Sequence, residues 1–238
     1  FGEFHWHTEL SSDGGCPLTL GLRSARDHLN MNYCFPSDHT PSPEKWVYTV
    51  KIVNQFNAPD KFVTVFGWEN STSQGHDNYY FTDPNHPVKA FGQAAAEYKK
   101  PFEIQDRLAT LQDSLDQDDK FIAVPHHTNA VSETYQKDGT PYWHPYTFTR
   151  GDNFHRLIEV FQTRGNMERN EYTDAWRGWY HFGSSVQDAL AKGYKVGFTG
   201  GSDNHVSRPG RSTAALEAYG RIPPSTQALT GTWTDRIE

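Results

Sequence analysis

Short runs typical of β-strands alternate with helical patterns along this chain, and no other feature constrains its fold as strongly. The strand-like runs cover residues 1–6, 32–35, 61–68, 78–82, 121–124, 157–161 and 195–199. Strands that alternate with helices predict a parallel sheet, either open or closed into a barrel. The 238 residues are enough for one such domain with a sizeable core.

The expected helices cover residues 22–30, residues 104–115, a segment that begins at Ser42-Pro43 and a segment between Ser184 and Gly193. Ser42 is expected to be an N-cap, because Pro43 then occupies the first helical position, which needs no N–H. Ser184 and Gln187 fit a capping box. The long segments 128–155 and 164–183 are expected to be lids or binding loops, unless each contains a helix that its pattern does not reveal.

A histidine or an acidic residue follows nearly every predicted strand. These residues are His5, His7, Asp13, Asp38, His39, Glu69, His76, His126, His127, Asp203 and His205. In parallel sheets and barrels, the carboxyl ends of the strands meet at the edge where active sites form. So many imidazoles and carboxylates at one edge would be costly to desolvate without cations. The mixture of nitrogen and oxygen ligands without thiolates predicts Zn, Mn or Fe ions.

Each of these motifs alone has an ordinary structural explanation. His5 and His7 form a pattern that is common on surfaces and in cores, and Asp203-Asn204-His205 also fits a turn. The conjunction of the motifs at strand ends is what favours a metal centre. The remaining histidines have no such placement and are expected to be surface or core residues: His28, His86, His144, His155 and His181.

The motifs, taken in order, resemble those of the PHP (polymerase and histidinol phosphatase) superfamily of metal-dependent phosphoesterases. The resemblance is carried by Phe4-His5-Trp6-His7-Thr8, Ser12-Asp13-Gly14, Ser37-Asp38-His39, Gly67-Trp68-Glu69, Gly75-His76, Pro125-His126-His127 and Gly201-Ser202-Asp203-Asn204-His205. It covers nearly the whole chain. The Pro-His-His and Gly-Ser-Asp-Asn-His variants, with Ile158-Glu159-Val160 before Gly165 and Glu168, resemble most the branch catalogued as domain of unknown function 3604.

This resemblance implies an α/β fold, a distorted seven-stranded (β/α) barrel related to the TIM barrel, with up to three metals. His5, His7, Glu69 and Asp203 would hold the first metal. Glu69 would bridge to a second metal, which His76 and His126 would also bind. Asp13, His39 and His205 would hold the third metal. Residues 1–238 are expected to form one such domain, and a truncated or unusually short C-terminus is left open.

The implied reaction is the hydrolysis of phosphate mono- or diesters by a metal-bridging hydroxide. Arg164 or Arg208 would neutralise charge on the phosphoryl oxygens, although an arginine beside a glycine is by default a solvated loop residue. His127 or His205 would protonate the leaving alkoxide. Two alternatives are left open. The same centre could act on phosphotriesters, carboxylic esters or amides, or metals could stabilise a module that binds a partner without catalysis.

Charge and composition shape the expected partners. The formal net charge of −7 does not favour nucleic acid or membranes, which attract clustered Lys and Arg. The expected partner is therefore a small-molecule phosphate ester, with no nucleic acid, no membrane and an open oligomeric state. The compartment is also open between the cytoplasm and, with a leader outside this chain, the periplasm or the exterior. Cys16 and Cys34 could pair or remain reduced.

Overall fold

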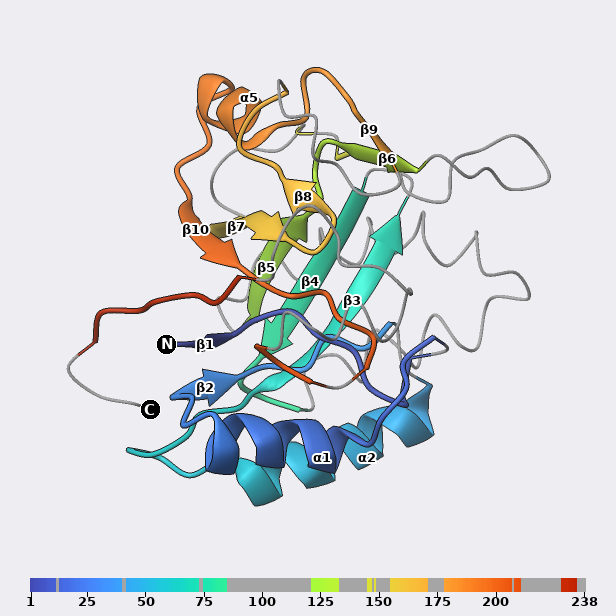
Figure 1. Cartoon of the computed structure of the whole chain (residues 1–238), viewed down its shortest axis with the longest axis vertical. Coiled ribbons are helices and arrows are strands. Elements are labelled where there is room, and N and C mark those ends of the chain that lie inside the picture. The colour runs from blue at the N-terminus through green and yellow to red at the C-terminus, as the bar shows by residue number, and fades with distance from the viewer. Residues whose placement is uncertain are drawn as a thin grey trace.

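The computed structural model has a mixed α/β fold built from small sheets (Figure 1). It describes residues 1–11, 13–39, 42–72, 75–84, 121–132, 145–146, 148, 155–170, 178–206, 208–210 and 228–234. The helices are α1 (Leu18–Arg23), its π-helical continuation η1 (Ser24–His28), α2 (Pro43–Phe56) and α5 (Val186–Ala191). The predicted helix over residues 104–115 lies outside the described residues.

The strands are short, and several are preceded or followed by extended backbone. They are β1 (Gly2–Glu3), β2 (Tyr33–Cys34), β3 (Phe66–Thr72), β4 (Gly75–Phe81), β5 (Phe121–His126), β6 (Ala130–Ser132), β7 (Leu157–Gln162), β8 (Gly165–Asn166), β9 (Gly178–Tyr180) and β10 (Gly197–Gly200). The two long segments that were expected to be loops therefore contain β6, β8 and β9.

The sheets combine parallel and antiparallel pairs. Strands β1 and β2 pair in parallel, as do β10 and β7, whereas β3, β4 and β5 form an antiparallel sheet. The predicted seven-stranded (β/α) barrel is therefore wrong, since no closed barrel is seen in the described residues. The reason is the connection between β3 and β4, which runs only from Thr72 to Gly75. A parallel neighbour needs a crossover of a dozen or more residues, so this connection makes a hairpin.

Isolated parallel bridges nevertheless join the ends of the small sheets. Trp6 bridges to Asn204, so the segment after β1 lies beside the segment after β10. His39 bridges to Glu69, which brings the segment after β2 to strand β3. As a result, several strand ends converge on one region although they do not form one continuous barrel.

Helix α2 confirms the prediction made from Ser42 and Pro43. The Ser42 side chain accepts a hydrogen bond from the backbone N–H of Lys45, and Pro43 is the first helical residue. The buried face of the helix includes Trp46 and Val53, which pack in one cluster with aromatic residues of β3 and β4. In Figure 1, α1 and α2 lie side by side beneath β1 and β2.

Helix α5 begins one residue later than the sequence suggested. Its capping box joins Ser185 to Asp188 rather than Ser184 to Gln187. The helix ends just before Gly193, whose positive φ of 91° lets the chain turn toward β10.

Two further observations concern the chain as a whole. Cys16 and Cys34 are thiols and do not form a disulfide. Among the helices that the structure describes, none combines the length and apolar character needed to cross a membrane.

Candidate metal centre

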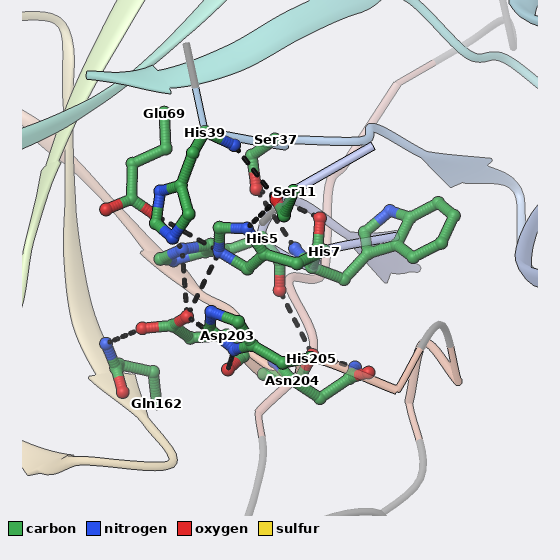
Figure 2. Close-up of polar contacts among 12 residues, drawn as sticks. His5, His7, Ser11, Ser37, His39, Glu69, Gln162, Asp203, Asn204 and His205 are labelled. Atoms are coloured by element: carbon green, nitrogen blue, oxygen red, sulfur yellow. Dashed lines mark hydrogen bonds and ion pairs between the residues drawn. The ribbon is translucent and has the colours of Figure 1, made fainter. Parts of the chain in front are cut away.

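The first group of candidate ligands contains two histidines and two carboxylates. His5 and His7 follow β1 and lie on the same side of the extended backbone, as residues i and i+2 do. Nε2 of His7 lies 3.1 Å from Oε2 of Glu69 and 3.2 Å from Oδ1 of Asp203. Nε2 of His5 lies 3.5 and 3.4 Å from the same two oxygens. Figure 2 shows both rings between the two carboxylates, and all four side chains are buried.

The second group lies on the other oxygen of Glu69. Oε1 is 2.7 Å from Nδ1 of His76 and 3.3 Å from Nε2 of His126. These two histidines are direct cross-strand neighbours in the β4–β5 register, which explains why their rings meet. His127 follows with a φ of 34°, and its ring centroid lies 4.5 Å from that of His76. Left-handed backbone thus places a second consecutive histidine at the same cluster, where a continuing strand would point it away.

The third group is the most exposed part of the centre. Nε2 of His39 lies 3.4 Å from Oδ1 of Asp13, and Nε2 of His205 lies 3.3 Å from Oδ2. The Asp13 side chain is 54% exposed, whereas Glu69 is 3% exposed. The His205 ring stacks on His7, with centroids 4.0 Å apart, so the third group adjoins the first. Solvent therefore reaches the centre from the side of Asp13.

Burial and charge set the protonation of these groups. Desolvation lowers the pKa of His76 and His126, lowers that of His127 well below its usual range, and lowers that of His205 to about 3. Neutral imidazole is the form that binds metals. Burial would raise the pKa of Glu69, but the surrounding histidines hold it well below its ordinary value. Burial would also lower the pKa of His5, but the carboxylates of Glu159 and Glu69 raise it to about 9. The other four histidines thus offer neutral nitrogens around an anionic carboxylate.

Asp203 presents its two oxygens to different partners. Oδ2 accepts a hydrogen bond of 2.8 Å from Nε2 of Gln162 and forms an ion pair with Arg164, while Oδ1 faces His5 and His7. Of the two arginines singled out in the sequence, the structure brings Arg164 into the centre, where it is buried. Arg208 lies beside Asn204, whose side chain accepts a hydrogen bond of 3.1 Å from the Arg208 backbone N–H.

Asp38 supports the centre and does not join the three groups. Its carboxylate accepts hydrogen bonds from the backbone N–H and hydroxyl of Thr8, at 2.6 and 2.8 Å, and from the Ser11 hydroxyl at 3.0 Å. The Ser11 hydroxyl also contacts Nδ1 of His7 at 2.9 Å. Asp38 therefore anchors the loop that orients His7.

Sequence reasoning did not assign roles to Ser11, Glu159 or Gln162. Glu159 had a readable signal, because it is a charged residue inside the predicted strand 157–161, where a buried acid needs a partner. Ser11 and Gln162 carry no comparable signal, because short polar side chains are common beside loops. Among the other histidines, His155 is buried, His28 and His181 are exposed, and His86 and His144 lie outside the described residues.

The donor atoms fit divalent metal ions. Ligand atoms lie within 4.8 Å of one another in three sets of side chains: His5, His7, Glu69 and Asp203; Glu69, His76, His126 and His127; and His7, His39 and His205. Nε2 of His5, both ring nitrogens of His126 and Oδ1 of Asp203 are buried and make no hydrogen bond within the described residues. Buried polar atoms are costly without a partner. Cations placed between the rings and the carboxylates would satisfy them, and nitrogen with oxygen donors suits Zn, Mn or Fe.

Comparison with known proteins shows the fold more clearly than the activity. None of the curated proteins matches the sequence. Endonuclease Q, solved in complex with a 27-mer duplex substrate that has an abasic lesion at the active site, shares the fold at 14% identity and a TM-score of 0.52. The match covers 88% of this chain but 50% of the Endonuclease Q chain.

Two other solved structures are similar at TM-scores below 0.5. PsfC from Pseudomonas syringae PB-5123 is 16% identical with a TM-score of 0.48, over 86% of this chain and 76% of that one. A protein from Bifidobacterium adolescentis, described as a "putative metal-dependent phosphoesterase", is 13% identical with a TM-score of 0.47, over 94% and 91% of the two chains.

The likeness to Endonuclease Q corrects the expectation of a small-molecule partner and no nucleic acid. A protein with this fold holds duplex DNA at its active site. The expectation rested on the net charge of −7, which belongs to the chain as a whole. Net charge governs non-specific attraction, whereas an active site recognises a phosphate through the groups beside it.

The sequence itself supplies the family. Residues 22–191 match the family described as protein of unknown function (DUF3604), which is more than half of the chain. The matched segment includes candidate ligands of all three groups, from His39 to His127. The resemblance inferred from the motifs is thus confirmed, and the chain belongs to the DUF3604 family.

Proposed function

We propose that this protein is a metal-dependent phosphoesterase that hydrolyses phosphate mono- or diesters at the centre built around Glu69. One observation carries the proposal. A single buried carboxylate faces His5 and His7 through Oε2, and His76 and His126 through Oε1. A carboxylate shared in this way can place two cations side by side, which is the arrangement that two-metal phosphoester hydrolysis requires.

The candidate ligands divide among three positions. His5, His7, Glu69 and Asp203 would hold one ion, Glu69 with His76 and His126 a second, and Asp13 with His39 and His205 a third. Divalent ions at these positions would polarise phosphoryl oxygens and lower the pKa of a water molecule. Zn, Mn and Fe each suit this ligand set.

The protein's own side chains have two tasks in this proposal, which are to neutralise phosphoryl charge and to transfer a proton. Arg164 pairs with Asp203, and its charge would neutralise phosphoryl oxygens bound at the centre. Arg208 is the second proposed contact for phosphoryl oxygens, from the loop beside Asn204. His127 or His205 would transfer a proton to the leaving oxygen. Burial lowers the pKa of both rings and so favours their neutral forms, and each must take up a proton before it can act as an acid.

The first experiment measures metal content and turnover in the same preparation. Protein purified without chelator is analysed for Zn, Mn and Fe, and is assayed on p-nitrophenyl phosphate, on its diester and on duplex DNA with an abasic lesion. We expect two to three equivalents of metal and turnover that His5→Ala abolishes. His28→Ala is the matched control, because His28 is an exposed histidine outside the three groups. The proposal would be refuted if the protein contained less than one equivalent of metal per chain and if added Mn²⁺ or Zn²⁺ did not increase that content.

The same preparation separates the alternatives. Turnover of phosphotriesters, carboxylic esters or amides in place of phosphate mono- and diesters would keep the centre and change the substrate class. Full metal occupancy without turnover on any ester, together with a metal-dependent gain in stability, would favour the non-catalytic binding module.

A further inference from the structure

Glu159 is a buried carboxylate that contacts a candidate ligand from outside the three groups. It lies within β7, where the backbone pairs with Thr199 of β10, and its side chain has no exposed surface. Its Oε2 and Oε1 lie 3.0 and 3.2 Å from Nδ1 of His5. Desolvating a carboxylate inside a sheet is costly, so the contact with its partner must offset much of the desolvation free energy.

From these contacts, and on the basis of the proposed metal centre, we infer that Glu159 is a positioning residue for the ion at His5, His7, Glu69 and Asp203. The carboxylate holds a proton on Nδ1 of His5. The Nε2 lone pair then points toward Glu69 and Asp203, which lie 3.5 and 3.4 Å away on the opposite side of the ring. A carboxylate behind a ligand histidine fixes its tautomer and orientation and increases the basicity of the ligating nitrogen.

Gly201 supplies an independent observation for this contact. A Cβ atom at Gly201 would overlap Oε2 of Glu159 and lie 2.6 Å from Cβ of His5. Gly201 does not have the positive φ that would require glycine for backbone reasons. The absence of a side chain at this position therefore leaves the space in which Glu159 and His5 meet.

His7 and His5 are held in different ways. Nδ1 of His7 contacts the neutral hydroxyl of Ser11, whereas Nδ1 of His5 contacts a carboxylate directly. The loss of Glu159 should therefore weaken the ion held by His5, His7, Glu69 and Asp203 and leave the other two ions in place. The role of Glu159 can therefore be measured as a change in the affinity for one metal equivalent.

Glu3 offers a matched control for Glu159. Both carboxylates are fully buried and lie close to His5. Glu3 accepts hydrogen bonds from the backbone N–H groups of His5 and Ser202, at 3.0 and 2.9 Å. Glu3 therefore contacts the main chain, whereas Glu159 contacts the imidazole ring of His5. If the loss of any buried charge near His5 weakens metal binding, the glutamine variants of Glu3 and Glu159 should both bind metal more weakly. If Glu159 positions the His5 ring, only the Glu159 variant should do so.

The test measures metal binding without any substrate. The full chain and the variants Glu159→Gln, Gly201→Ala and Glu3→Gln are stripped with chelator and titrated with Zn²⁺ against a competing chromophoric chelator. We expect Glu159→Gln to weaken one equivalent by about 10- to 100-fold and to leave the others unchanged. Gly201→Ala should weaken the same equivalent, which keeps the test available if Glu159→Gln does not fold. Glu3→Gln should bind every equivalent as the wild type does.

A second readout follows the proton itself. In ¹⁵N-labelled, Zn²⁺-loaded protein, the ring spectra should show His5 with its proton on Nδ1, and Glu159→Gln should shift or remove that proton resonance. Unchanged affinities in Glu159→Gln and Gly201→Ala, or an equal loss in Glu3→Gln, would overturn the inference. Either result can occur in a protein that still binds metal and turns over phosphate esters. Failure of the wild type to bind metal would instead refute the proposed centre.

Discussion

Replacing Glu69 with glutamine should remove two metal equivalents at once. Glu69→Gln keeps the size of the side chain and deletes its charge. In the structure, one carboxylate oxygen faces His76 and His126, and the other faces His5 and His7. If Glu69 is shared between two ions, then one substitution weakens both.

The magnitude follows from the burial of the pair. Glu69 is 3% exposed, so water cannot replace the lost charge. Removing one partner of a buried ion pair costs about 3–5 kcal/mol. At about 1.4 kcal/mol for each tenfold change, each of the two ions should bind roughly 10²- to 10⁴-fold more weakly. Asp203 belongs to the first group alone, so Asp203→Asn should weaken a single equivalent.

The assay compares these two variants with the wild type. Each protein is stripped with chelator, titrated with Zn²⁺ and analysed for retained metal after gel filtration. The expected order is two equivalents weakened in Glu69→Gln and one in Asp203→Asn. Equal losses in the two variants, or a Glu69→Gln protein that retains wild-type affinity for all equivalents, would refute the bridging geometry.

Three other predictions test acid chemistry, catalysis and the scaffold. Burial raises the pKa of Glu3 from 4.5 to about 7, so the unfolded chain releases this proton at lower pH than the folded chain does. Stability from this group is complete below pH 4.5 and is lost as the pH rises to about 7. In denaturant titrations of metal-free protein, the free energy of unfolding should fall with rising pH by about 3 kcal/mol less in Glu3→Gln than in the wild type. The same pH dependence in both proteins would contradict this prediction. His127→Ala should lower turnover about 10²- to 10⁴-fold with metal content preserved, whereas loss of an equivalent would make His127 a ligand. Ser185→Ala removes the cap of α5 and should lower the melting temperature by about 2–4 °C, as expected for about 1 kcal/mol. Its metal content should not change.

Elements that depend on neighbouring residues were predictable from the sequence. Helix α2 begins at Pro43 after Ser42, because a cap and a first turn depend on residues a few positions apart. Strands β5 and β7 lie where apolar runs predicted them, and His126 ends β5. Strand β3 begins five residues later than predicted, at Phe66, and includes Glu69 within it.

The sheet arrangement was not predictable by the same reasoning. The alternation of strands and helices suggested parallel pairing throughout, yet β4 folds back directly on β3. Strand patterns describe which residues are apolar and do not specify the partner strand. The length of the connection decides the direction here, and that length becomes informative only once the ends of β3 and β4 are known.

By itself, the sequence determined which side chains could ligate metal and their order along the chain, since the donor types and their places beside apolar runs are local features. The tertiary structure alone decided which atoms face one another. It showed that the oxygens of Glu69 point to two different groups of histidines, and that Asp38 holds a loop. It also paired His5 with Glu159, 154 positions away. Contacts of that separation arise when strand ends converge, and no local pattern records them.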